Sequence, residues 1–112
     1  MPIGEKPETS VSYNELLVLQ AMASGCHYGF EIMAFTDLSA GTVYPMLRRF
    51  EVSGLVESSK EDAAAAHARG RPPRRMHVLR ASGRSVLISA REALISRQRE
   101  MGLIPPERSS GK

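Results

Sequence analysis

Apolar residues recur at helical spacing in four segments of the chain. The first segment begins with Ser12-Tyr13-Asn14-Glu15, which has the pattern of a capping box, and the last runs from Ser82 to about Met101. A short helix is expected at about Tyr28 to Thr36, and another after Ser39, which can cap it. The apolar stripes that predict these helices are Leu16, Leu19, Met22 and Ala23; Phe30, Ile32, Met33 and Phe35; Val43, Leu47 and Phe50; and Leu87, Ala90, Leu94, Gln98 and Met101.

The pattern changes after Gly54, which ends the third helix. Two short strands are predicted, at Leu55 to Lys60 and at about Arg74 to Arg80. The intervening EDAAAAHARGRPP contains Gly70 and two prolines, which prevent regular structure near its tip. Its alanine run can turn briefly helical, but we predict a long mobile hairpin loop.

Three helices, a two-stranded hairpin with a basic loop and a trailing helix form the winged helix-turn-helix plan, whose commonest partner is DNA. We therefore predict a mainly α fold with a small β-hairpin. The winged domain is expected at residues 10–81, with its wing at about 55–80, followed by a C-terminal dimerisation helix at 82–102. Residues 1–9 and 103–112 are expected to be flexible tails.

The charge of the chain is unevenly distributed. The 112 residues carry a net charge of +3, which by itself indicates only mild attraction to polyanions. Residues 1–37 have a balance of −4, whereas residues 38–84 have a balance of +5. Positive charge therefore gathers in the third helix and the wing, as expected of a chain that presents one face to an acidic partner.

Several other kinds of site and function are disfavoured by the sequence. Cys26 is the only cysteine, so one chain can form neither a disulfide nor a thiolate-rich zinc site, and we interpret it as a small hydrophobe rather than a redox sensor. His67 and His77 lack partners at ligand spacing, and no catalytic pattern occurs. We expect no metal, no cofactor and no enzymatic activity.

The hydropathy pattern also bears on localisation. The N-terminal MPIGEKPETS is polar, and no apolar run approaches the length that spans a bilayer. We expect a cytoplasmic protein with no membrane contact.

Three motifs occur in order along the chain: YGFEI at Tyr28–Ile32, GTVYP at Gly41–Pro45 followed by an Leu-Arg-Arg triplet, and GRP at Gly70–Pro72. With these motifs the chain resembles the PadR (phenolic-acid decarboxylase repressor) family of bacterial transcriptional regulators. The resemblance extends from Leu16 to Arg84 and implies a repressor that binds DNA through the helix containing GTVYP.

The chain also departs from the family pattern. Arg80 stands where relatives usually have a Thr before the final helix, so Ser82 or solvent is expected to cap that helix. Phe50 replaces a usual Leu and still suits a buried position. The second helix is shorter than in many relatives, and one helix follows the wing, as in the short subfamily that lacks a separate C-terminal domain.

Burying Val43, Leu47 and Phe50 leaves a polar face on the third helix that can contact phosphates and base edges. In the wing, Arg-Gly-Arg-Pro is similar to an AT-hook, which lays arginines in the minor groove, although simple phosphate attraction is the alternative. The predicted DNA-binding residues are Ser39, Thr42, Tyr44, Pro45, Arg48, Arg49, Arg69, Arg71 and Arg74.

The final helix carries more apolar residues than a small winged helix can cover, which predicts a two-fold dimer. Its interface is expected to contain Leu17, Leu87, Leu94, Ile95 and Met101. A small-molecule effector is expected near that interface. We thus predict a homodimeric repressor of double-stranded DNA that binds a pseudo-palindromic operator and is released by a ligand or signal. The alternative is a winged-helix module that docks proteins and binds DNA weakly or not at all.

Overall fold

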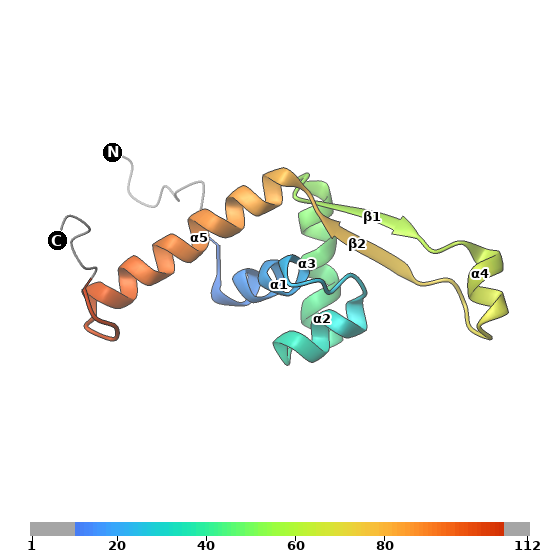
Figure 1. Ribbon diagram of the computed structural model, residues 1–112, viewed down its shortest axis with the longest axis horizontal. Helices are drawn as coiled ribbons and strands as arrows, with labels where there is room; N and C mark the ends of the chain where they lie inside the picture. The colour runs from blue at the N-terminus through green and yellow to red at the C-terminus, as the bar shows by residue number, and fades with distance from the viewer. Residues whose placement is uncertain (1–10, 107–112) are drawn as a thin grey trace.

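The computed structural model describes residues 11–106 and shows a helical body with a projecting hairpin (Figure 1). The predicted mainly α fold with a small β-hairpin is confirmed. Of the tails predicted to be flexible, 1–9 and 103–112, residues 1–9 and 107–112 lie outside the described residues. The elements are α1 (Tyr13–Ala23), α2 (Gly29–Thr36), α3 (Ala40–Val52), β1 (Val56–Lys60), α4 (Ala63–Ala68), β2 (Arg75–Leu79) and α5 (Ala81–Glu100).

Helix α1 begins at the predicted capping box. The amide of Glu15 donates to the Ser12 hydroxyl at 3.1 Å, and the amide of Ser12 donates to the Glu15 carboxylate at 2.9 Å. Val18 and Leu19 are both fully buried, because α2, β2 and α5 all pack against this helix. Both side chains belong to the core of the protomer.

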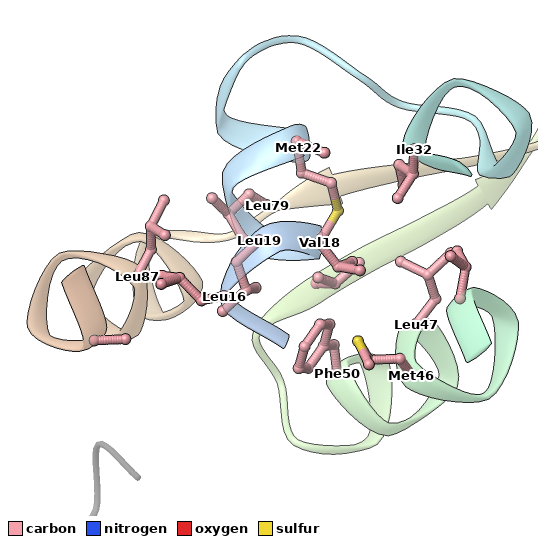
Figure 2. Close-up of a cluster of buried hydrophobic side chains, with 14 residues drawn as sticks. Leu16, Val18, Leu19, Met22, Ile32, Met46, Leu47, Phe50, Leu79 and Leu87 are labelled. Atoms are coloured by element: carbon pink, nitrogen blue, oxygen red, sulfur yellow. The ribbon is translucent and has the colours of Figure 1, made fainter. Parts of the chain in front are cut away.

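The hydrophobic core lies between α1, α3, the base of the hairpin and the first half of α5, and Figure 2 shows α1 side chains at its centre. The stripe predicted for α3 is confirmed, since Val43, Leu47 and Phe50 are at most 5% exposed. Burying a large aliphatic or aromatic side chain contributes about 1.5–3 kcal/mol, so this stripe fixes the orientation of α3 firmly. The largest fully buried side chains are Leu19, Ile32, Leu47, Val18 and Val43.

Strands β1 and β2 pair in antiparallel register, with Ser58 opposite His77. The far edge of β2 is covered by the segment before α2: the His77 amide donates to the His27 carbonyl at 2.7 Å, and Tyr28 forms a bridge with Met76. The hairpin is therefore tied to the helical body along its base.

The predicted mobile loop between the strands is wrong in one respect, because it contains the six-residue helix α4. Asp62 caps α4 by accepting a hydrogen bond from the Ala65 amide at 2.9 Å, and Ala66 is buried. The helix ends at Ala68, and Gly70, just after the cap residue Arg69, turns the chain with a φ of +72°. The hairpin thus carries a folded tip (Figure 1).

Helix α5 starts against the turn that precedes β1. The Ser82 hydroxyl donates to the Gly54 carbonyl at 2.7 Å and therefore anchors α5 instead of capping it. Arg80 occupies the cap position without a side-chain cap bond. Within residues 11–106, no helix is both long and apolar enough to cross a membrane.

The second half of α5 extends beyond the body (Figure 1). Leu87, which was predicted to lie at the dimer interface, is 3% exposed and packs in the core of its own protomer. Leu94 packs partly against the same core. Ile88, Ile95 and Met101 remain 54%, 38% and 60% exposed.

Candidate nucleic-acid interface

The outward face of α3 carries most of the residues predicted to bind DNA. Ser39, Tyr44, Pro45, Arg48 and Arg49 are exposed, and Thr42 is half-buried. Helical geometry explains this placement, since these positions lie away from the buried stripe. Helix α3 continues without interruption through Pro45, whose missing amide removes one hydrogen bond near the start of the helix.

The N-terminus of α3 lies at this face. The amides of Thr42 and Val43 both donate to the Ser39 carbonyl, at 3.0 and 2.9 Å. The Ser39 side chain was expected to cap the helix, but its hydroxyl instead donates to the Thr42 hydroxyl at 3.3 Å. The first amides of α3 therefore lack a side-chain cap and can bind an anion such as a phosphate.

Tyr44 is 48% exposed, and its ring lies directly against Gly29 at the start of α2. A Cβ at position 29 would collide with the Tyr44 ring and hydroxyl, so the absence of a side chain there makes room for the tyrosine. The second and third helices are in this way joined beside the candidate interface. The sequence gives one signal of this contact, the glycine in the YGFEI motif.

The two adjacent arginines of α3 differ in their surroundings. The Arg48 side chain has no hydrogen-bond or ion-pair partner in residues 11–106. Arg49 donates to the Glu15 carboxylate at 3.3 Å. Partial burial raises the pKa of Glu15, but the Ser12 amide and Arg49 outweigh it, so this pKa lies below its ordinary value. Within residues 11–106 the Arg48 guanidinium is thus unpaired, whereas Arg49 shares one of its donors with Glu15 and keeps the others for DNA.

In the wing, three of the candidate arginines lie around the Glu61 carboxylate. Arg71 donates two hydrogen bonds to the Glu61 carboxylate, the longer at 3.0 Å, and Arg69 and Arg74 lie 3.9 and 3.7 Å from it. The side chain of Arg69 is 66% exposed, whereas that of Arg71 is 26% exposed. The segment is not extended like an AT-hook, because Arg69 ends α4 and Gly70 has a positive φ.

Arg74 connects the wing to the start of α2. Its guanidinium lies 4.0 Å from the ring centroid of Tyr28 and 5.3 Å from that of Phe30. The Nε atom is buried without a hydrogen-bond partner. These cation–π contacts give Arg74 a structural role between the wing and the body.

One cluster was not predicted from the sequence. His77 is 3% exposed, and its Nδ1 atom lies 2.7 Å from the Ser58 hydroxyl, which also donates a short hydrogen bond to Glu51. Burial lowers the pKa of His77, an effect partly offset by Glu51. Both acid and imidazole contact the same hydroxyl group, so this is not the order of a nucleophile, base and acid relay. The cluster joins α3 to both strands.

Within the part of the chain that the structure describes, no three His, Cys, Asp or Glu side chains gather into a metal site. Cys26 is half-buried against the core, and burial raises the pKa of its thiol. This environment is the one expected of a packing residue.

The family model described as "Transcriptional regulator PadR-like family" matches residues 18–89. No curated protein sequence matches the chain. A PadR family regulator from Clostridium difficile R20291 has a similar structure, with a TM-score of 0.71, 21% identity, and coverage of 81% of this chain and 96% of that one. A PadR-like regulator from Bacillus cereus aligns with a TM-score of 0.61 and 21% identity over 83% of this chain and 92% of its own.

A third similar structure is that of Bordetella bronchiseptica BpsR, described as regulated in its DNA binding by 6-hydroxynicotinic acid. It has a TM-score of 0.64 and 16% identity, and the match covers 94% of this chain and 74% of BpsR. These structural similarities concern the fold, and the family match extends from α1 into α5 across the whole candidate interface.

Proposed function

The chain belongs to the PadR-like family of transcriptional regulators, and from this premise we propose that it is a cytoplasmic, homodimeric repressor of a pseudo-palindromic operator. Members of this family are DNA-binding regulators and not enzymes. A ligand or another signal releases the repressor from its operator in this proposal. The description of BpsR supports a small-molecule effector by analogy.

The observation that carries the proposal is the outward face of α3. It combines an uncapped helix N-terminus, the Tyr44 hydroxyl and the unpaired Arg48, all held in place by a fully packed inner face. Cations and free amides on a rigid helix are what DNA phosphates and guanine edges require. Arg69, whose side chain is exposed at the wing, adds a second positively charged group that can attract DNA.

The exposed apolar residues of α5 support the dimer. Ile88 and Ile95 are seven residues apart and lie on one side of the helix, and Leu17 is half-buried on α1. We propose that these residues, with Leu94 and Met101, pack against a second copy around a two-fold axis. Two recognition helices would then contact DNA half-sites about 34 Å apart.

A hollow of about 340 Å³ lies where α1, α3 and α5 meet. Its walls are mostly apolar, with the Glu15–Arg49 pair at one side. An effector bound there would contact both the dimer helices and the recognition helix, so it is our candidate site for operator release.

The test is selection of bound sequences from random duplex DNA at physiological salt. We expect one enriched palindromic site for the wild type, and weaker enrichment for Arg48→Ala. Arg80→Ala is the matched control, because Arg80 lies near Glu57, 3.7 Å away, and not on α3. If no sequence is enriched and binding to partner proteins is insensitive to salt, the protein-docking module is the better description.

A further inference from the structure

A second hollow, of about 380 Å³, lies between α3, the recognition helix of the proposed function, and the wing. On the helix side, its residues follow the spacing of a single face of α3, and on the strand side they alternate along one face of β2. The residues that line it are Tyr44, Leu47, Arg48, Glu51, Arg75 and His77.

Two guanidinium groups with unused donors line this hollow. The Arg48 side chain has no partner in the described chain, and the Arg75 side chain donates no hydrogen bond to any residue in 11–106. The nearest acid to Arg75 is Glu51, with its Oε2 atom 3.9 Å from the Arg75 Nε atom. A guanidinium offers five N–H donors in a planar fork that fits the oxygen atoms of a phosphate or carboxylate.

Glu51 does not neutralise both cations. Its carboxylate accepts the hydrogen of the Ser58 hydroxyl. Because that hydroxyl has one hydrogen, the Nδ1 atom of His77, 2.7 Å away, must donate to the Ser58 oxygen. The carboxylate is thus held at the strand side of the hollow, and with a neutral His77 the remaining charge is that of one unpaired cation.

We propose that this hollow is a phosphate-binding site. A DNA backbone phosphate binds there between Arg48 of α3 and Arg75 of β2, with the Tyr44 hydroxyl as a further donor. The inference rests on the proposed function. It adds Arg75 to the DNA-binding residues and assigns Glu51 as the acid that limits the affinity of this site for phosphate. A phosphate bound there touches the recognition helix and the wing together, and so fixes the angle between them on DNA.

The first test compares Arg75→Ala with Arg80→Ala. Both arginines are on or next to β2, and their side chains are 58% and 54% exposed, but they lie on opposite faces of the hairpin. Affinity for a short mixed-sequence duplex is measured over a range of salt concentrations. We expect the slope of log affinity against log salt to fall by about 0.9 for Arg75→Ala, the loss of one phosphate contact, and to stay unchanged for Arg80→Ala.

Glu51→Gln supplies a gain that misfolding cannot imitate. The amide keeps the size of the side chain and can still accept from Ser58, but it removes the negative charge from the hollow. We expect tighter duplex binding than in the wild type. Equal salt slopes for the two arginine variants, or no gain in duplex affinity for Glu51→Gln, would contradict the proposed phosphate-binding site. DNA binding by the wild type would still stand.

Inorganic phosphate provides the second test, at constant ionic strength with chloride as the replaced anion. We expect saturable shifts of the guanidinium resonances of Arg48 and Arg75 in the wild type, and no saturable shift at Arg48 in Arg75→Ala. If the wild type binds no duplex, the proposed function fails. The phosphate titration then decides separately whether the hollow binds a free oxyanion. If the wild type shows no saturable shifts, phosphate binding in the hollow is contradicted as well.

Discussion

At Gly83, the absence of one carbon atom determines how closely α5 can approach the turn before β1. A Cβ at this position would collide with the backbone carbonyl of Leu55 and with the side chain of Leu79. The backbone at Leu55 is fixed, because the Arg80 amide also donates to its carbonyl at 2.9 Å. The contact therefore leaves no room for a larger residue.

Gly83→Ala should lower the free energy of unfolding by about 1–3 kcal/mol, the usual effect of overpacking. Gly41→Ala is the control, since Gly41 is also helical but is exposed, and its nearest neighbour to a new Cβ is the Ser39 hydroxyl at 3.9 Å. That variant should gain about 0.5–1 kcal/mol from reduced backbone entropy. Urea unfolding measures both, and equal stabilities would contradict the close approach.

Glu61 is the acid around which three arginines of the wing lie. The Arg71 guanidinium, with the Arg74 amide, lowers the pKa of Glu61 from 4.5 to about 2. Because the folded pKa is the lower one, the stabilising effect of this ion cluster is complete above pH 4.5 and is lost as the pH falls toward 2. Acidification over this range should loosen the wing.

The Glu61 carboxyl resonance, followed by NMR, gives this pKa directly. Arg71→Ala should raise it toward 4.5, whereas Arg69→Ala, which removes a partner 3.9 Å away, should raise it less. Equal effects of the two substitutions would mean that the hydrogen bonds from Arg71 do not set the pKa.

The residues of α3 show what sequence reasoning can and cannot predict. A turn of 100° per residue was sufficient to place Tyr44 and Arg48 outside and Leu47 inside. The partners of the charged residues could not be predicted in this way. Arg49 meets Glu15 from 34 residues away and His77 meets Ser58 from 19 residues away, and such contacts depend on how the elements pack.

Among the elements, α4 is the one that the hydrophobic pattern missed. Six residues of AAAAHA contain no apolar stripe, and a helix this short is not stable by itself in water. It forms because Asp62 caps it and Ala66 is buried in the wing. The other helices were predictable because their apolar residues repeat with the helical period.

Removing the N-cap of α4 and, in a second variant, that of α1 should show whether the wing and the helical body unfold independently. Asp62→Ala should unfold α4, seen as faster amide exchange at Ala65 and Ala66, with little change in the overall melting temperature. Ser12→Ala removes the cap of α1, which contributes to the core, and should lower the free energy of unfolding by about 1 kcal/mol. Similar global effects of the two variants would show that the wing and the body unfold together.

At the scale of the whole molecule, α5 exposes its apolar side chains beyond the body of the protomer. Leu94 already packs partly against its own core, so its substitution would disturb the protomer as well as a dimer. Ile95 and Ile88 are the better probes, because they are more exposed.

Ile95→Glu would place a charge in the proposed interface and should convert the dimer to monomers at micromolar concentration, with reduced affinity for the operator. Val52→Glu is the control, because Val52 is 83% exposed at the end of α3, outside the proposed dimer face. Sedimentation should report a dimer for the control and a monomer for Ile95→Glu. A dimer in both cases would place the interface elsewhere.

The covered edge of β2 also bears on how the protein behaves when it is concentrated. An open strand edge is a template for another chain, and long apolar edges lead to aggregation. Here His27 and Tyr28 occupy the edge of β2, and the open edge of β1 has only five residues, VESSK, two of them charged. Edge-to-edge growth of sheets into fibres is therefore disfavoured on both sides of the hairpin, and self-association is left to the helices.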